Sequence, residues 1–157
     1  MHYKQRKIQE LVYFIKTGSG EDDFEEFYRF PASTTMREEM LAKQLCTYLV
    51  LEGKQFRLLY NEMNGEEEYL VLEDEGMAKR YMEEAQYDGK EIVIEFRQFK
   101  PYGDCPVKQR LKVMTHLDVL EFLTKDIVDI PDIGQREVDS TEVDSDRKCY
   151  VIYFKEA

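Results

Sequence analysis

The stretch CYVIYF, residues 149–154, contains six apolar residues in succession. Strands with one solvent-exposed face alternate apolar and polar residues, whereas an unbroken apolar run is typical of a strand covered on both faces. The sequence therefore predicts that Cys149–Phe154 forms a strand in the centre of a sheet.

Strand patterns recur along the rest of the chain. Residues 8–16 are rich in β-branched and aromatic side chains, and residues 56–60 carry apolar side chains at every second position. The pair Asn64 and Gly65 is the commonest kind of tight-turn signal, so it predicts a hairpin. Together the patterns predict strands at residues 8–16, 27–30, 56–60, 69–72, 92–96, 107–114 and 149–154.

Three segments have helical spacing. Thr35 begins a capping-box pattern, and apolar residues recur on one helical face across residues 36–49. Residues 77–86 also place their apolar side chains on one face and end at an Asp-Gly turn. Thr115 and Asp118 form a second cap pattern before leucines at helical spacing.

These elements indicate an α+β protein with a mostly antiparallel sheet, or sheets, and about three helices. The length of 157 residues suits a single compact domain over 1–157. The order of elements also suggests a tandem duplication, with pseudo-repeats at 1–75 and 90–157 joined by a helix over 76–88. Residue identity between the halves is at noise level, so a coincidence of element order is the alternative.

The order strand, strand, helix, strand, strand in residues 8–73 resembles the ubiquitin-like β-grasp. Within it, Thr34–Leu72 is similar in general pattern to ubiquitin-like adaptor modules such as Ras-association domains. The resemblance covers one half of the chain, involves no specific motif and carries no functional residue across. It implies β-grasp-like ββαββ halves and a protein-binding module, although a fold of this kind hosts many functions.

The chain is strongly acidic, with 22 basic and 33 acidic residues and a formal net charge of −11. Such a charge repels phosphate backbones, so direct nucleic-acid binding is not expected. Residues 17–75 carry 5 basic and 15 acidic residues, a net −10, and therefore hold most of the negative charge. This surface suits a basic partner, or it serves solubility alone.

The cysteines and the N-terminal end indicate a compartment. Cys46, Cys105 and Cys149 are widely spaced and odd in number, which favours reduced thiols in the cytoplasm. The basic N-terminal end lacks the features of a signal peptide, and no run approaches the ~20 apolar residues of a membrane span. No Gly-rich phosphate loop or other cofactor motif is present, so no cofactor is expected.

Acidic residues cluster next to the predicted hairpin turn. Glu66, Glu67 and Glu68 follow it directly, and residues 73–75 add three more acids at the end of the next strand, in one predicted ridge. Such a ridge would mainly set the rate and specificity of binding to a basic protein. The leading hypothesis is therefore a non-catalytic, cytoplasmic interaction or regulatory protein that binds its partner through this ridge.

Two other functions remain open from the sequence. Glu142, Asp144 and Asp146 alternate, so in an extended strand they would project from one face and could bind Mg²⁺ or Ca²⁺. The same residues could instead guard a strand edge against pairing with another chain. A small metal-dependent enzyme or cation-binding protein is thus one alternative, and a DNA-mimic inhibitor, suggested by the charge of residues 17–75, is the other.

No catalytic residue is assigned. His116 falls in the first turn of a predicted helix and has no neighbouring nucleophile in sequence. Cys105 lies on a predicted loop beside Asp104, and a neighbouring carboxylate does not activate a thiol. Cys46 and Cys149 are expected to be small core residues.

Overall fold

The computed structural model describes residues 1–31 and 36–156, which form ten strands and two helices. The N-terminal part contains β1 (Glu10–Lys16), β2 (Phe24–Pro31), α1 (Arg37–Leu45), β3 (Tyr48–Leu51), β4 (Lys54–Asn64) and β5 (Glu67–Met77). The C-terminal part contains β6 (Ile92–Gln98), β7 (Val107–Val113), α2 (His116–Leu123), β8 (Ile127–Ile130), β9 (Gly134–Asp144) and β10 (Cys149–Phe154).

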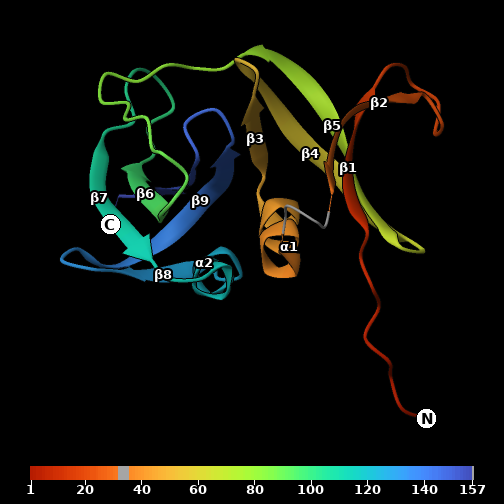
Figure 1. Cartoon of the computed structure of the whole chain (residues 1–157). Coiled ribbons are helices and arrows are strands. Elements are labelled where there is room, and N and C mark those ends of the chain that lie inside the picture. The colour runs from red at the N-terminus through yellow and green to blue at the C-terminus, as the bar shows by residue number, and fades with distance from the viewer. Residues whose placement is uncertain (32–35, 157) are drawn as a thin grey trace.

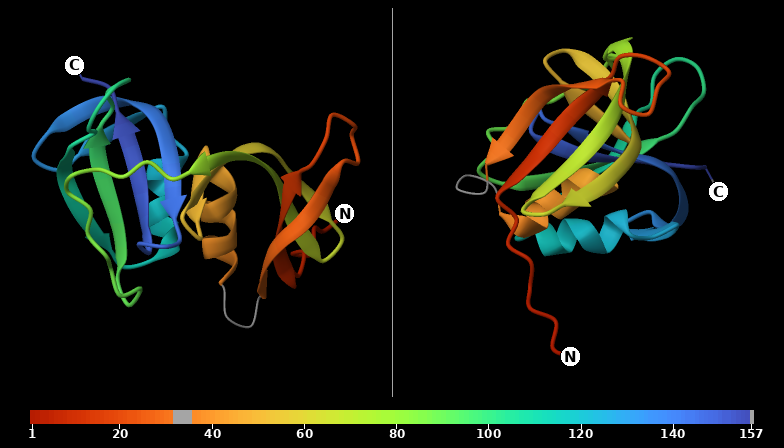
Figure 2. Two further views of the ribbon diagram at one scale, coloured as in Figure 1. Left: turned by 90° about the horizontal axis from the view of Figure 1, so that it is seen from above. Right: turned by 90° about the vertical axis from the view of Figure 1, so that its right-hand side faces the viewer.

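The strands form one mixed sheet in the order β2-β1-β5-β4-β3-β9-β10-β6-β7, and β8 pairs with β9 beside this path. Three neighbouring pairs are parallel: β1 with β5, β6 with β10, and β3 with β9. The pairing of β3 with β9 joins the two parts of the chain. The sheet curves around the two helices, which contact each other (Figures 1 and 2).

The C-terminal strand confirms its prediction. All six residues of β10 are buried, and the strand lies between β9 and β6. Tyr150, Ile152 and Phe154 pack in the core that includes the helices, while Cys149, Val151 and Tyr153 belong to a second cluster on the opposite face. The absence of polar alternation thus reflects cover on both faces.

The hairpin and the cap of α2 also confirm their predictions. Asn64 pairs with Glu67 across the turn, and Gly65 has φ +61°, a left-handed conformation that glycine adopts without steric cost. Thr115 accepts a hydrogen bond from the main-chain N–H of Asp118 in a complete capping box. Local signals of this kind need no information from distant residues.

The first predicted helix differs from α1 at both ends. The predicted cap residue Thr35 lies outside the described residues, and Met36 precedes the helix without a side-chain cap. The helix ends at Leu45, and Tyr48–Leu51 form β3 instead of a further helical turn. These four apolar residues, which include an aromatic and a β-branched side chain, gain main-chain partners on both sides, since β3 lies between β4 and β9.

The third predicted helix, over 77–86, is wrong. Met77 ends β5, where it pairs with Lys54 of β4. Residues 78–90, called the covering segment below, contain neither helix nor strand. Tyr81 and Tyr87 of this segment pack against the second cluster, which lies on the sheet face turned away from the helices and is called the outer cluster below, whereas Met77 and Met82 are each 89% exposed.

The expected fold class is therefore corrected. The sheet is mixed, with three parallel pairs, and not mostly antiparallel, and the described residues hold two helices and not three. Neither β3 nor β8 is among the predicted strands, so the expected ββαββ order is also incomplete. Neither described helix is long and apolar enough to cross a membrane.

Truncating the centre of β10 should destabilise the whole sheet. Ile152 is fully buried, so Ile152→Ala is expected to lower the free energy of unfolding by about 2–5 kcal/mol in urea titrations. Ile127→Ala is the matched control, because Ile127 is 58% exposed and its truncation should cost less than ~0.5 kcal/mol. Equal losses for the two variants would contradict the central role of β10.

Candidate functional site

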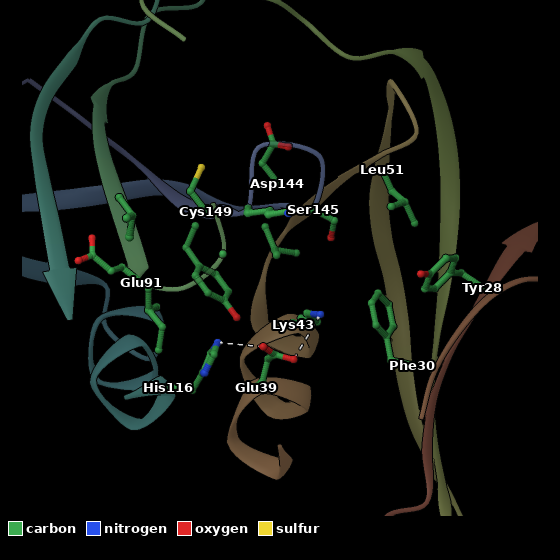
Figure 3. Close-up of a pocket in the computed structure, with 16 residues that line it drawn as sticks. Tyr28, Phe30, Glu39, Lys43, Leu51, Glu91, His116, Asp144, Ser145 and Cys149 are labelled. Carbon is green, nitrogen blue, oxygen red and sulfur yellow. Dashed lines mark ion pairs between the residues drawn. The ribbon is translucent and has the colours of Figure 1, made fainter. Parts of the chain in front are cut away.

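A pocket of about 290 Å³ lies between α1 and the sheet above it (Figure 3). Side chains from both parts of the chain line it, because it extends from β2 across α1 to β10 and α2. The residues that define its chemistry are Tyr28, Phe30, Glu39, Lys43, His116 and Tyr150. A concave site that combines aromatic walls with a few convergent polar groups is the usual form of a binding pocket.

Glu39 is the centre of the polar group in this pocket. Glu39 and Lys43 are four residues apart on α1 and so lie on one helix face, with Lys43 Nζ 3.7 Å from Glu39 Oε2. His116 Nε2 approaches Glu39 Oε1 at 3.5 Å from α2. Lys43 Nζ also lies 3.8 Å from the ring centroid of Phe30, a cation–π contact.

Burial controls the charge state of this group. Burial lowers the pKa of Lys43, although the carboxylate of Glu39 opposes the effect. Burial also lowers the pKa of His116 below its ordinary value, which favours the neutral imidazole, although the charge of Glu39 opposes the effect. Within this group the ammonium of Lys43 balances the carboxylate of Glu39, and Glu91, Asp144 and Lys148 are the other charged residues that line the pocket.

A buried hydroxyl group without a hydrogen-bond partner in the described part of the chain also lies at this pocket. The hydroxyl of Ser145 is buried and has no hydrogen-bond partner among the described residues. Such a group favours a ligand that can donate or accept a hydrogen bond there, because an unsatisfied buried hydroxyl is costly.

The pocket reaches an edge of the sheet. β2 is the outermost strand on its side and pairs only with β1 within the described chain. Tyr28 and Phe30 of this edge strand form one wall of the pocket, opposite His116 (Figure 3). An edge strand and a pocket therefore lie side by side.

The predicted partner site at Glu66, Glu67 and Glu68 is only partly exposed. Glu68 is 3% exposed and binds Arg6 at 3.1 Å, and Glu67 binds Arg29 at 2.8 Å. Glu66 is exposed in the turn and is the one member of the three without an ion pair among the described residues. Alternation along β5 explains the difference between Glu67 and Glu68, because neighbouring residues of a strand face opposite sides, whereas Glu66 lies in the turn before the strand.

The acidic ridge predicted over the hairpin is divided. Residues 66–68 and 73–75 lie at opposite ends of β5, roughly 20 Å apart at the rise of an extended strand. The second group is largely paired within the same hairpin, with Arg57 bound to Glu73 and Lys54 bound to Asp74. The hairpin therefore does not present one continuous acidic surface.

The three carboxylates proposed as metal ligands have separate partners. Asp144 Oδ2 accepts from Arg147 Nε at 3.0 Å, while both oxygens of Asp146 accept main-chain N–H groups at 2.8 Å. Glu142 is 6% exposed and accepts one hydrogen bond, from Tyr153 Oη at 3.4 Å. No three His, Cys, Asp or Glu side chains within the described ranges are grouped to hold a metal ion. Glu142 and Asp144 lie on β9, which is interior to the sheet, and Asp146 lies in the turn that follows, so none of the three guards a strand edge.

A buried ionic network was missed from the sequence. Glu95 is fully buried and receives Arg97 Nε at 3.0 Å and both terminal nitrogens of Arg147 at 2.8 and 3.0 Å. Tyr87 donates a further hydrogen bond to Glu95 at 2.7 Å. Burial raises the pKa of Glu95, but the hydrogen bonds from Arg147 and Tyr87 outweigh it and hold that pKa below the ordinary value.

The two arginines of this network also fix the covering segment. Arg97 donates to the carbonyl oxygens of Glu83 at 2.6 Å and Cys105 at 2.8 Å, and Arg147 donates to that of Ala85 at 3.1 Å. The main chain of an irregular segment is thereby satisfied without a helix. The available sequence signal was the position of Glu95 and Arg97 within an otherwise apolar strand.

The remaining predicted residues are placed as follows. His116 opens α2, as predicted, but its neighbour Glu39 comes from the other part of the chain. Cys105 lies on a loop yet is 2% exposed, and its Sγ accepts the main-chain N–H of Lys100 at 3.4 Å. Cys46 and Cys149 are buried core residues, as predicted, and burial raises the pKa of both thiols.

Comparison of the chain with models of protein families, with curated proteins and with solved structures gave no match. Its function is therefore inferred from its own side chains and their geometry.

Removing the central carboxylate of the network should be costly. Glu95→Gln leaves the buried guanidinium of Arg97 without its anion and removes one of the two carboxylates that bind Arg147, so unfolding in urea at pH 7 is expected to show a loss of about 3–5 kcal/mol. Glu91→Gln is the control, since its ion pair with Lys112 is exposed and contributes at most ~1 kcal/mol. A loss for Glu95→Gln no larger than that of the control would show that the network does not stabilise the fold.

The buried carboxyl of Glu142 should make stability fall with rising pH. Burial, with the nearby charge of Asp144, raises the pKa of Glu142 from 4.5 to about 7. Between these values the folded chain binds more protons than the unfolded chain, so stability decreases as pH rises through this range. Glu142→Gln removes the effect and should stabilise the protein at pH 8 by on the order of 3 kcal/mol, with little gain at pH 4. A difference between variant and wild type that does not change with pH would contradict this assignment.

Proposed function

We propose that this protein is a non-catalytic, cytoplasmic interaction protein that binds a basic, extended segment of a protein partner along the outer edge of β2. The observation that carries the proposal is the position of β2, which is both an edge of the sheet and a wall of the pocket above α1. A segment added to this edge would gain main-chain hydrogen bonds from β2.

The pocket supplies side-chain recognition for such a segment. Side chains of an added strand alternate between the two faces of the sheet, so every second one points to the face on which α1 lies. Tyr28 and Phe30 offer aromatic contacts there, and Glu39 with Lys43 offers polar ones. Main-chain pairing then gives affinity, and the pocket gives specificity.

Charge favours a basic partner and selects this edge over the other one. Glu21 and Asp22, in the turn before β2, and Glu25, near its start, are exposed and make no ion pair within the described chain. The opposite edge strand, β7, exposes basic side chains that repel a basic segment and guard that edge, namely Lys108, Arg110 and Lys112. Three buried, unpaired cysteines support a reducing compartment.

The proposed site replaces the ridge at residues 66–68 as the main contact. Arg29 of β2 joins Glu67 to Glu10 and Glu26, so Glu67 already has an ion-pair partner within the chain next to the edge strand. Glu66 remains exposed two strands away from the edge and adds to the negative field there.

The test uses peptides selected from a random displayed library against the 157-residue chain. Selected peptides are expected to be rich in Lys and Arg, and their binding should shift the amide resonances of residues 24–30 more than those of β7. Replacing Glu21, Asp22 and Glu25 by Gln, Asn and Gln should slow association and weaken binding several-fold, mostly at low salt.

A matched control removes three exposed acids elsewhere, with Glu62, Glu121 and Asp126 replaced by Gln, Gln and Asn. The control should bind the selected peptides as the wild type does. Failure to select any peptide, or resonance shifts confined to surfaces other than β2, would refute the proposal.

A further inference from the structure

A second pocket, of about 570 Å³, lies on the face of the sheet turned away from the helices. Tyr153 of β10 lines it together with Cys105, and both belong to the outer cluster. The covering segment and the loop over residues 99–106 contribute to its walls. This pocket is separate from the β2 edge and from the pocket above α1.

Four aromatic side chains and one buried carboxyl define its chemistry. The aromatic residues come from β3, the covering segment, the loop after β6 and β10, and they are Tyr48, Tyr81, Phe99 and Tyr153. Glu142 reaches the pocket from β9, is more than nine-tenths buried, and is held by a single long hydrogen bond from Tyr153. A buried carboxyl with so few partners is costly without a ligand.

The pocket already accepts an ammonium group of its own chain. Lys79 Nζ lies 5.3 Å from the ring centroid of Tyr81, within cation–π range, and Lys79 also lines the pocket. Lys79 is an exposed residue, so its side chain can leave without disturbing the core. The contact identifies the kind of group that the pocket accommodates.

The remaining charges also favour a cation. Three carboxylates line the pocket, on Glu75, Asp139 and Glu142, against the two ammonium groups of Lys79 and Lys100. Displacing Lys79 would leave a more negative pocket, which an incoming cation would neutralise. Aromatic faces next to a carboxylate are the usual surroundings of bound organic ammonium ions.

We propose that this pocket binds an organic ammonium group, which replaces Lys79 over the ring of Tyr81 and pairs with the carboxylate of Glu142. Aromatic contact holds the alkyl groups around the nitrogen, and the carboxylate supplies the counter-charge. A free quaternary amine and a methylated lysine side chain share this chemistry.

Binding of a cation to Glu142 should depend on pH. The pKa of Glu142 is raised to about 7 by burial and by Asp144, and Arg147, Tyr153 and Arg97 oppose the rise. An ammonium ion binds the ionised form, so affinity should increase about tenfold between pH 6 and pH 8. The other titratable groups that line this pocket are Tyr48, Glu75, Lys79, Tyr81, Lys100, Cys105 and Asp139.

Calorimetric titration of the full chain with choline tests the proposal, and 3,3-dimethylbutanol, which has choline's shape without its charge, is the control ligand. Choline should bind, tenfold more tightly at pH 8 than at pH 6, and the neutral control should bind at least tenfold more weakly. Glu142→Gln should weaken choline binding at pH 8 about tenfold and remove the pH dependence.

Lys79→Gln provides a second, independent variant. It should tighten choline binding several-fold because it removes the internal competitor, an effect that a purely structural residue would not produce. Lys90→Gln, an exposed lysine outside the pocket, should leave binding unchanged. A peptide containing trimethyl-lysine is titrated in parallel, and tighter binding of the peptide or of choline identifies the source of the ammonium group.

Equal binding of choline and its neutral analogue would overturn the proposal. No change in Lys79→Gln would also overturn it, because the displacement of Lys79 would then be wrong. Neither result bears on the peptide site at β2, since the two pockets share none of their lining residues.

Discussion

The parallel pairing of β3 with β9 is the interaction on which the arrangement of the molecule depends. It aligns Tyr48 with Glu142 and Val50 with Asp144, and it makes one sheet from strands that lie more than ninety positions apart. The same pairing allows α1 to contact α2, which brings Glu39 to His116. It also brings Tyr48 next to Glu142 in the second pocket. The first pocket likewise includes residues of both strands, Leu51 of β3 and Val143 of β9.

Buried charged residues in the C-terminal part position the covering segment on the sheet. Glu95, Arg97 and Arg147 satisfy one another, and the two arginines use their remaining donors on main-chain oxygens of the covering segment and the following loop. Buried ion pairs of this kind add little net stability compared with an apolar core, but breaking one is costly. Here they specify where an irregular segment lies.

Local signals in the sequence predicted local structure well. The Asn64-Gly65 turn, the cap at Thr115 and the apolar run of β10 each depend on neighbouring residues, and each is confirmed. The parallel pairs were missed because strand partners are set by contacts between distant residues. The helix over 77–86 was wrong because Tyr81, like Tyr87 just after it, packs on a sheet face that the sequence pattern does not reveal. Likewise, the carboxylates of Glu68 and Glu142 looked exposed in sequence because their partners, Arg6 and Tyr153, lie elsewhere in the chain.

The covering segment is the main-chain link between the two parts of the protein, yet it contributes no strand to the sheet. What holds the parts together is the ladder between β3 and β9, with the contact between the helices. The peptide chain thus connects the two parts through residues 78–90, whereas the non-covalent contacts that hold them together lie at the β3–β9 ladder and between the helices. A chain cut within residues 78–90 would still present complementary halves, so the protein is a natural candidate for reconstitution from two separately expressed fragments.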